Sequence, residues 1–237
     1  MNPLILSNEM ASGLEEEPGS LTLGTRVYRF VRRRILEGHL MPGTKLTLRG
    51  LADELGISMQ PVREAVNRLT AEATLEAPST RVVQVPRLKK ATVDELWQIR
   101  VLLEGQIAGF FAKNATEAHI SALKLATEKL LSANLDESNK AMVGGYEWSS
   151  LIAQGAASPL MASIAMNLRI RSSPHIAEAL TRSAKLETGF FEFSSRLMAE
   201  FTLAVHARDG ERARALRQAD LLTYQRYLYD RLGWSLT

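Results

Sequence analysis

Apolar residues are spaced differently in the two parts of this chain that meet near residue 92. Upstream, apolar positions recur every three or four residues at about 25–36, 48–55 and 59–72, which predicts three short helices. A brief β-prone run at 82–85 follows, bounded by prolines. Three helices and a short strand pair in so short a segment predict a winged helix-turn-helix.

Downstream of Thr92 every regular pattern has helical spacing. Helices are expected near 93–113, 117–133, 137–156, 159–171, 175–182, 187–207 and 210–232. Pro159, Pro174 and the Asp209-Gly210 pair separate some of them. The predicted fold class is therefore mainly α: an N-terminal winged helix-turn-helix followed by a C-terminal all-α helical bundle.

These patterns divide the chain into four parts. Residues 1–20 are acidic and lack sustained periodicity, so they are expected to form a flexible tail. Residues 21–88 form the predicted winged helix-turn-helix and residues 89–92 a linker. Residues 93–237 form the predicted helical domain.

Composition excludes several classes of protein. The chain has 237 residues, 46% of them hydrophobic, which is enough for a packed core. It contains no cysteine, so disulfide scaffolds and thiolate metal sites are excluded. Neither a secretory signal nor a membrane span is recognisable. We therefore expect a soluble, cytoplasmic protein without a membrane partner.

Charge is unevenly distributed along the chain. The formal net charge is +3, but residues 24–90 hold 13 Lys and Arg against 6 Asp and Glu. Residues 91–237 hold 16 of each and are neutral. A basic segment before a neutral one indicates that the first part meets a polyanion. Such asymmetry alone more often reflects a solvated surface.

The segment 48–69 has the pattern of a helix-turn-helix. Gly56 can end the first helix in a left-handed conformation, and Ser58 can cap the second, with Pro61 in its first turn. The second helix then presents to the major groove a set of polar side chains and one methionine. These are Met59, Gln60, Arg63 and Asn67. Arginine can pair with guanine, and glutamine or asparagine with adenine.

The runs 35–43 and 51–65 resemble the GntR family of bacterial transcription regulators. Residues 94–105 and 209–213 resemble the helical ligand-binding domain of its FadR/FCD branch. This resemblance implies DNA contacts to bases or phosphates from the winged helix-turn-helix. The implied residues are Arg49, Ser58, Gln60, Arg63 and Arg81.

The chain departs from the family pattern at three positions of this domain. Met59 stands where an arginine is usual, Val82 where the wing usually has glycine, and Ala73 where a glycine usually follows the second helix. Met59 removes one charged contact, so the operator sequence or affinity is expected to differ from that of typical members.

The FCD branch commonly holds a divalent metal through an aspartate and three histidines. The aspartate position falls on Gly145, and the histidine positions fall on Ser149, Met198 and Asp220. One carboxylate does not make a transition-metal site. We therefore expect no metal and no other cofactor.

A ligand pocket is still expected in the helical domain. Arg100 and Glu104 are four residues apart on one helix face. One interpretation is an ion pair that supports the helix. The other is that Arg100 is buried and binds a small organic acid or acyl effector. The other expected lining residues are Tyr146, Trp148, Ser149, Met198 and Asp220. Loss of ligand sensing is the alternative.

Together these features predict a regulator, not an enzyme. The resemblance implies a homodimer that binds a palindromic double-stranded DNA operator, more often as a repressor than as an activator. No phosphate-binding loop, metalloprotease motif or nucleophile elbow is present. A helical metabolic enzyme and a structural DNA-binding protein without a ligand are the competing classes.

Overall fold

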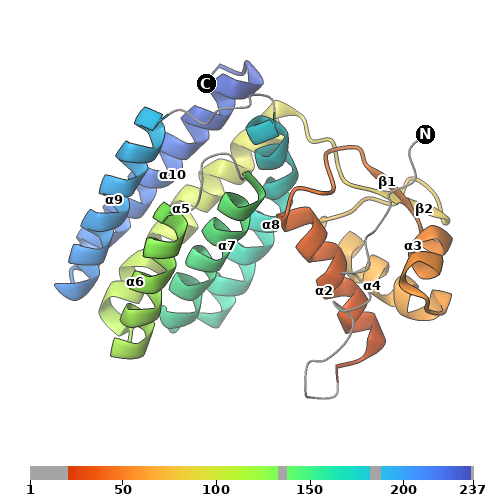
Figure 1. Cartoon of the computed structure of the whole chain (residues 1–237), viewed down its shortest axis with the longest axis horizontal. Helices are drawn as coiled ribbons and strands as arrows, with labels where there is room; N and C mark the ends of the chain where they lie inside the picture. Colours follow the sequence, from red (N-terminus) through yellow and green to blue (C-terminus); the bar gives the residue numbers. More distant parts are fainter. Residues whose placement is uncertain (1–20, 133–137, 182–187, 236–237) are drawn as a thin grey trace. The chain divides into compact units, whose positions relative to one another are not determined.

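The computed structural model describes residues 21–132, 138–181 and 188–235 (Figure 1). The expected acidic tail, residues 1–20, lies outside the described residues. The chain divides into two compact units. The first comprises the residues up to Ile35 with His39–Arg87, and the second comprises Leu36–Gly38 with the residues from Leu88 onward.

The first unit is the predicted winged helix-turn-helix. Its elements are α2 (Leu23–Leu36), β1 (Lys45–Thr47), α3 (Leu48–Leu55), α4 (Met59–Ala71) and β2 (Val82–Gln84). The two strands pair antiparallel, with Leu46 opposite Val83, and form the wing. One apolar face of each helix is buried, and these faces form the core of the unit. Its main residues are Val27, Val31, Ile35, Leu51, Val62, Val66 and Leu69.

Local chemistry fixes both ends of α3. The side-chain oxygen of Thr47 accepts a hydrogen bond from the backbone N–H of Gly50 at 3.0 Å. Gly56 ends the helix with φ 62°, the left-handed conformation predicted for it. The predicted side-chain cap of α4 is wrong, because Ser58 stands at the N-cap without a capping hydrogen bond. The Ser58 hydroxyl is therefore not used by the helix.

The second unit contains only helices among its described residues. They are α5 (Lys90–Asn114), α6 (Glu117–Ser132), α7 (Ser138–Gly155), α8 (Pro159–Thr181), α9 (Thr188–His206) and α10 (Gly210–Leu232). Helix α10 packs most extensively against α5 (Figure 1). Because α5 begins at Lys90, residues 90–92 of the expected linker belong to its first turn. None of the described helices combines the length and apolar character needed to cross a membrane.

Helix α8 differs from the prediction. The pattern predicts two helices separated at Pro174, but one helix runs from Pro159 to Thr181 with Pro174 inside it. Proline removes one backbone hydrogen bond and ordinarily ends or kinks a helix. Here residues 172–177 are all buried, so packing on both sides of Pro174 holds the helix together. Ser173 adds a hydrogen bond from its hydroxyl to the Arg169 carbonyl.

An ion cluster joins α5 to α10 inside the second unit. Nε of Arg100 donates to Oε1 of Glu104 at 2.7 Å, and Nη2 of Arg217 donates to Oε2 of the same carboxylate. Nη1 of Arg217 donates to Oδ2 of Asp220 at 2.6 Å. The Arg100 guanidinium also lies over the Trp97 ring, 4.3 Å from its centroid. Arg100 is completely buried, and Glu104 and Arg217 nearly so.

The arginines determine the charge of Glu104. Burial by itself raises the pKa of this carboxyl, but Arg100, Arg217 and Arg169 lower it by a larger amount. The resulting pKa is about 2, compared with the usual 4.5. Glu104 is therefore ionised at neutral pH although it is buried. Because its pKa is depressed in the folded state, its contribution to stability is present above pH 4.5 and is lost as the pH falls toward 2.

We expect Glu104→Gln to lower the free energy of unfolding at pH 7 by about 3–5 kcal/mol, because it leaves the buried Arg100 without its carboxylate and leaves Arg217 with Asp220 alone. Stability of the variant should also change less than that of the wild type between pH 4.5 and pH 3. Urea unfolding at a series of pH values measures both effects. The matched control is Glu147→Gln, which removes an exposed partner of Lys129 and should change stability by less than about 1 kcal/mol. Equal stability of Glu104→Gln and wild type at pH 7 would contradict the role of the cluster.

Ala73 provides a second test, since it has φ 53°, a left-handed conformation that favours glycine. Ala73→Gly should stabilise the first unit by about 1 kcal/mol. Ala71→Gly, at the end of α4, is the control with ordinary helical geometry and should destabilise the unit by about 0.5–1 kcal/mol. Thermal unfolding of both variants checks the opposite signs; the same sign for both would disprove the argument.

Candidate nucleic-acid interface and ligand pocket

Helix α4 has one buried face and one polar face. Val62, Val66 and Leu69 pack into the core, while Gln60, Arg63 and Asn67 are exposed. The helical period of 3.6 residues separates the two sets. Ser58 is exposed just before the helix, and Met59 is half-buried at its start. The predicted base-reading residues therefore share one accessible face of α4.

The wing brings two further basic residues together. Arg49 lies in the first turn of α3, and Arg81 immediately precedes β2. The backbone N–H of Leu48 donates to the carbonyl of Arg81 at 3.3 Å, so Arg81 lies beside the residue that precedes Arg49. Both arginines are exposed, and Arg49 makes a 3.8 Å ion pair with Asp53, in which both side chains are exposed.

This arrangement has the chemistry of a surface that reads DNA. In the part of the chain that the structure describes, no hydrogen bond or ion pair engages the guanidinium of Arg63. The Gln60 amide makes one long hydrogen bond, 3.4 Å to Glu64. A free guanidinium can pair bidentately with guanine, and free carboxamides with adenine. Arg49 and Arg81 can contact phosphates, which set position rather than sequence.

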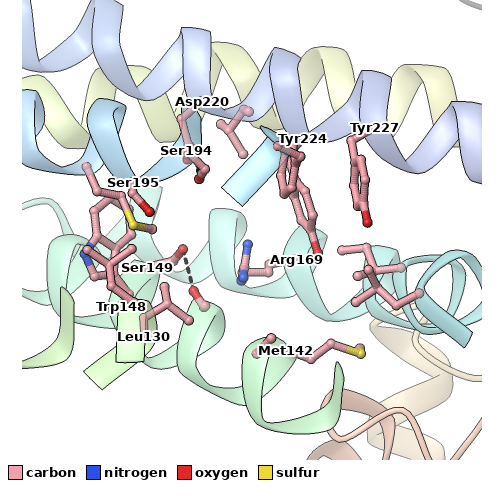
Figure 2. Close-up of a pocket in the computed structure, with 18 of the residues that line it drawn as sticks. Leu130, Met142, Trp148, Ser149, Arg169, Ser194, Ser195, Asp220, Tyr224 and Tyr227 are labelled. Carbon is pink, nitrogen blue, oxygen red and sulfur yellow. Dashed lines mark hydrogen bonds between the residues drawn. The ribbon is translucent and has the colours of Figure 1, made fainter. Parts of the chain in front are cut away.

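The second unit contains a pocket between α6, α7, α8, α9 and α10 (Figure 2). The space open to the centre of a water molecule is about 110 Å³, enough for a small organic molecule. Most of the lining is apolar, with a few polar groups. The polar lining residues are Ser149, Arg169, Ser173, Ser194, Ser195, Arg217, Asp220, Tyr224 and Tyr227.

The structure places the predicted pocket residues in two groups. Trp148, Ser149, Met198 and Asp220 line the pocket. Arg100, Glu104 and Tyr146 are not among the lining residues, so the structure corrects their predicted place. For Arg100 and Glu104 the reason is the ion pair between them, which holds the guanidinium against Trp97 instead of in the pocket.

Sequence reasoning missed the arginine that does face the pocket. Arg169 lies on α8 and is 8% exposed. Burial and the nearby Arg100 lower its pKa to about 10, which still leaves it charged at neutral pH. The sequence feature that could have indicated Arg169 is its charge within the largely apolar run of residues 164–170. Sequence reasoning also missed Tyr224 and Tyr227, which lie on α10 about one and two turns beyond Asp220, the last residue predicted to line the pocket.

The four positions that correspond to the family's metal ligands do not fit a metal ion. The Ser149 hydroxyl donates to the Gly145 carbonyl at 3.0 Å and accepts from Arg217. Asp220 is paired with Arg217, and Met198 offers only a thioether sulfur. Across residues 21–132, 138–181 and 188–235, no group of three or more His, Asp or Glu could hold a metal ion. Two arginines beside these positions would also repel a cation.

Comparisons with known proteins agree with this architecture. Residues 23–85 match the model of bacterial regulatory proteins of the gntR family, and residues 95–222 match the FCD domain. The HTH-type transcriptional regulator McbR of Escherichia coli K12 is 34% identical over 114 residues, which are 48% of this chain and 51% of McbR. An HTH-type regulator of Bacillus subtilis, YdhC, is 27% identical over 125 residues, 53% of this chain and 52% of the relative.

A solved structure of Escherichia coli McbR/YncC shares the fold. It covers 90% of this chain and 100% of its own chain, with a TM-score of 0.83 and 23% identity. The chain spans about half the length of the curated relatives it matches. The gntR model is that of bacterial regulatory proteins, and the FCD model alone matches more than half of the chain. This chain therefore belongs to the GntR family of bacterial regulatory proteins, with an FCD domain after its winged helix-turn-helix.

Proposed function

We propose that this protein is a cytoplasmic transcription repressor that binds a palindromic DNA operator as a homodimer. A small organic effector, bound in the helical unit without a metal, alters that binding. The observation that carries the proposal is the exposed polar face of α4, where Gln60, Arg63 and Asn67 are accessible to bases.

A homodimer follows from the way such helices read DNA. One recognition helix covers only a short half-site, and a two-fold dimer places two helices on successive turns of a palindrome. Regulators of this kind act by repression or by activation. Related proteins carry names of both kinds, an operon repressor from Paenarthrobacter nicotinovorans and the Glc operon activator of Escherichia coli.

Helix α10 connects the pocket to the first turn of the helical unit. Tyr227 lines the pocket, and two residues later the Tyr229 hydroxyl donates to Asp94 at 2.6 Å. Asp94 also pairs with Lys90 at 2.8 Å, in the first turn of α5. A ligand that shifts α10 can therefore act on the segment where the helical unit begins. It changes DNA binding only if it favours one arrangement over another.

We expect Arg63→Ala to weaken specific operator binding by about tenfold or more, because a bidentate guanine contact carries roughly 1–3 kcal/mol of discrimination. A gel shift on DNA upstream of the protein's own gene, repeated across salt concentrations, measures this. The wild type should bind tightly with a steep salt dependence.

Arg226→Ala is the matched control, because Arg226 is an exposed arginine of α10 outside the DNA-binding unit. It should bind the operator as the wild type does. Wild-type binding no stronger than to random DNA would argue against the proposed function at this site. A reporter gene behind the bound DNA should be more active without the protein; lower activity would identify an activator instead.

A further inference from the structure

The pocket contains a positive charge to which no described carboxylate bonds directly. Among the residues that the structure describes, no hydrogen bond or ion pair reaches the guanidinium of Arg169. Arg100 and Arg217, in contrast, are paired with Glu104 and Asp220. Figure 2 shows Arg169 projecting into the pocket, with the Tyr224 ring on the facing side.

The charges of this region do not balance. Among the residues that the structure describes, three buried arginines, Arg100, Arg169 and Arg217, are surrounded by two carboxylates, Glu104 and Asp220. One positive charge is in excess. A buried ion without a partner is strongly disfavoured, whereas a ligand anion at that point would be strongly favoured. The pocket therefore favours an occupant that carries a negative charge.

Gly145 makes room for this guanidinium. A Cβ atom at position 145 would lie 2.9 Å from Nη2 of Arg169, closer than side chains normally approach. Position 145 is also where the family resemblance places a metal-binding aspartate. In this chain a guanidinium stands beside the position of the missing carboxylate.

The rest of the pocket determines what else the occupant contains. Much of the lining is aliphatic, from Leu130, Met142, Ile176, Leu180, Met198 and Leu221. Phe190 stacks on Tyr227, with ring centroids 4.0 Å apart, and adds an aromatic wall. The Asp220 carboxylate already accepts from Arg217 and Ser194, and would repel a second negative group. These surroundings suit one charge joined to an apolar body.

We propose that the pocket binds a monocarboxylate with an apolar body, and that Arg169 receives the carboxylate in place of a metal ion. The Tyr224 hydroxyl faces the same space and can donate to the carboxylate as well. This inference rests on the proposed function, because it names the chemical class of the effector. Arg169 is then the residue that selects acids over neutral molecules.

The test is isothermal titration calorimetry of the full-length protein after dialysis against EDTA. The probes are acetate, hexanoate, octanoate, benzoate, hexanamide and adipate. We expect affinity to rise from acetate to the acids with larger apolar bodies. Hexanamide and adipate should bind at least about tenfold more weakly than hexanoate, because one lacks the charge and the other carries a second charge.

Two variants and one control identify the receptor. Arg169→Gln should weaken binding of the best acid roughly ten- to hundredfold, since a charge-assisted hydrogen bond is lost. Gly145→Asp should abolish it, because the new carboxylate pairs with Arg169 and occupies the place of the ligand. Arg226→Gln removes an exposed charge of α10 and should bind within about twofold of wild type. Circular dichroism melts show which variants are folded, and Gly145→Asp should melt no lower than Arg169→Gln.

Three results would overturn the inference: no binding of any acid, equal binding of hexanoate and hexanamide, or undiminished binding by Arg169→Gln. Binding that appears only after zinc or manganese is added would also overturn it. Gel shifts with the same acids test the proposed function separately. An acid that binds through Arg169 without changing operator affinity contradicts the proposed response but not the ligand class. Release of DNA by a neutral molecule that binds Arg169→Gln equally well contradicts the ligand class alone.

Discussion

The helical unit depends on one buried carboxylate. Glu104 lies inside the protein only because Arg100 and Arg217 bond directly to its two oxygens. These bonds connect neighbouring turns of α5 and attach α10 to them, so the side chains that α10 turns toward the pocket are placed relative to a fixed point. Arg217 also bonds to Asp220 and Ser149, and both of these line the pocket. The same cluster thus sets the packing of the helices and the polar part of the pocket.

The two units rely on different physical effects. The DNA-binding unit keeps its polar residues outside, where α4 and the wing leave arginine and amide groups exposed, and its interior is apolar. The helical unit keeps charges inside, where low polarity strengthens their interaction and makes their imbalance significant. DNA recognition uses exposed charges, from which bound water and counterions are easily displaced. Recognition of a small ligand benefits from a charge that few other molecules can reach.

Local patterns predicted the elements, and long-range pairing limited the prediction of the site. Gly56 and the apolar spacing of α3 and α4 act over a few residues, so the helix-turn-helix was readable from the sequence. At Pro174, burial of the neighbouring residues overrides the local rule that proline ends a helix. The spacing of apolar residues in the sequence does not reveal this burial. The sequence shows that Arg100 and Glu104 are four residues apart on one helix. It does not show that contacts with Trp97 and Arg217 hold them away from the pocket. Arg169 was missed because its environment is made by four other helices.

The bond between Arg217 and Glu104 spans 113 residues of the chain. A ribosome that adds about 5–20 residues per second needs roughly 6–23 seconds to cover that interval. During this time Glu104 and Arg100 have been synthesised while the arginine that completes their cluster has not. The winged helix-turn-helix, whose partners are all near in the sequence, can fold first. A nascent chain that stops before α10 would therefore carry a folded DNA-binding unit and an incomplete helical bundle. Chaperones and proteases would encounter the chain in that state.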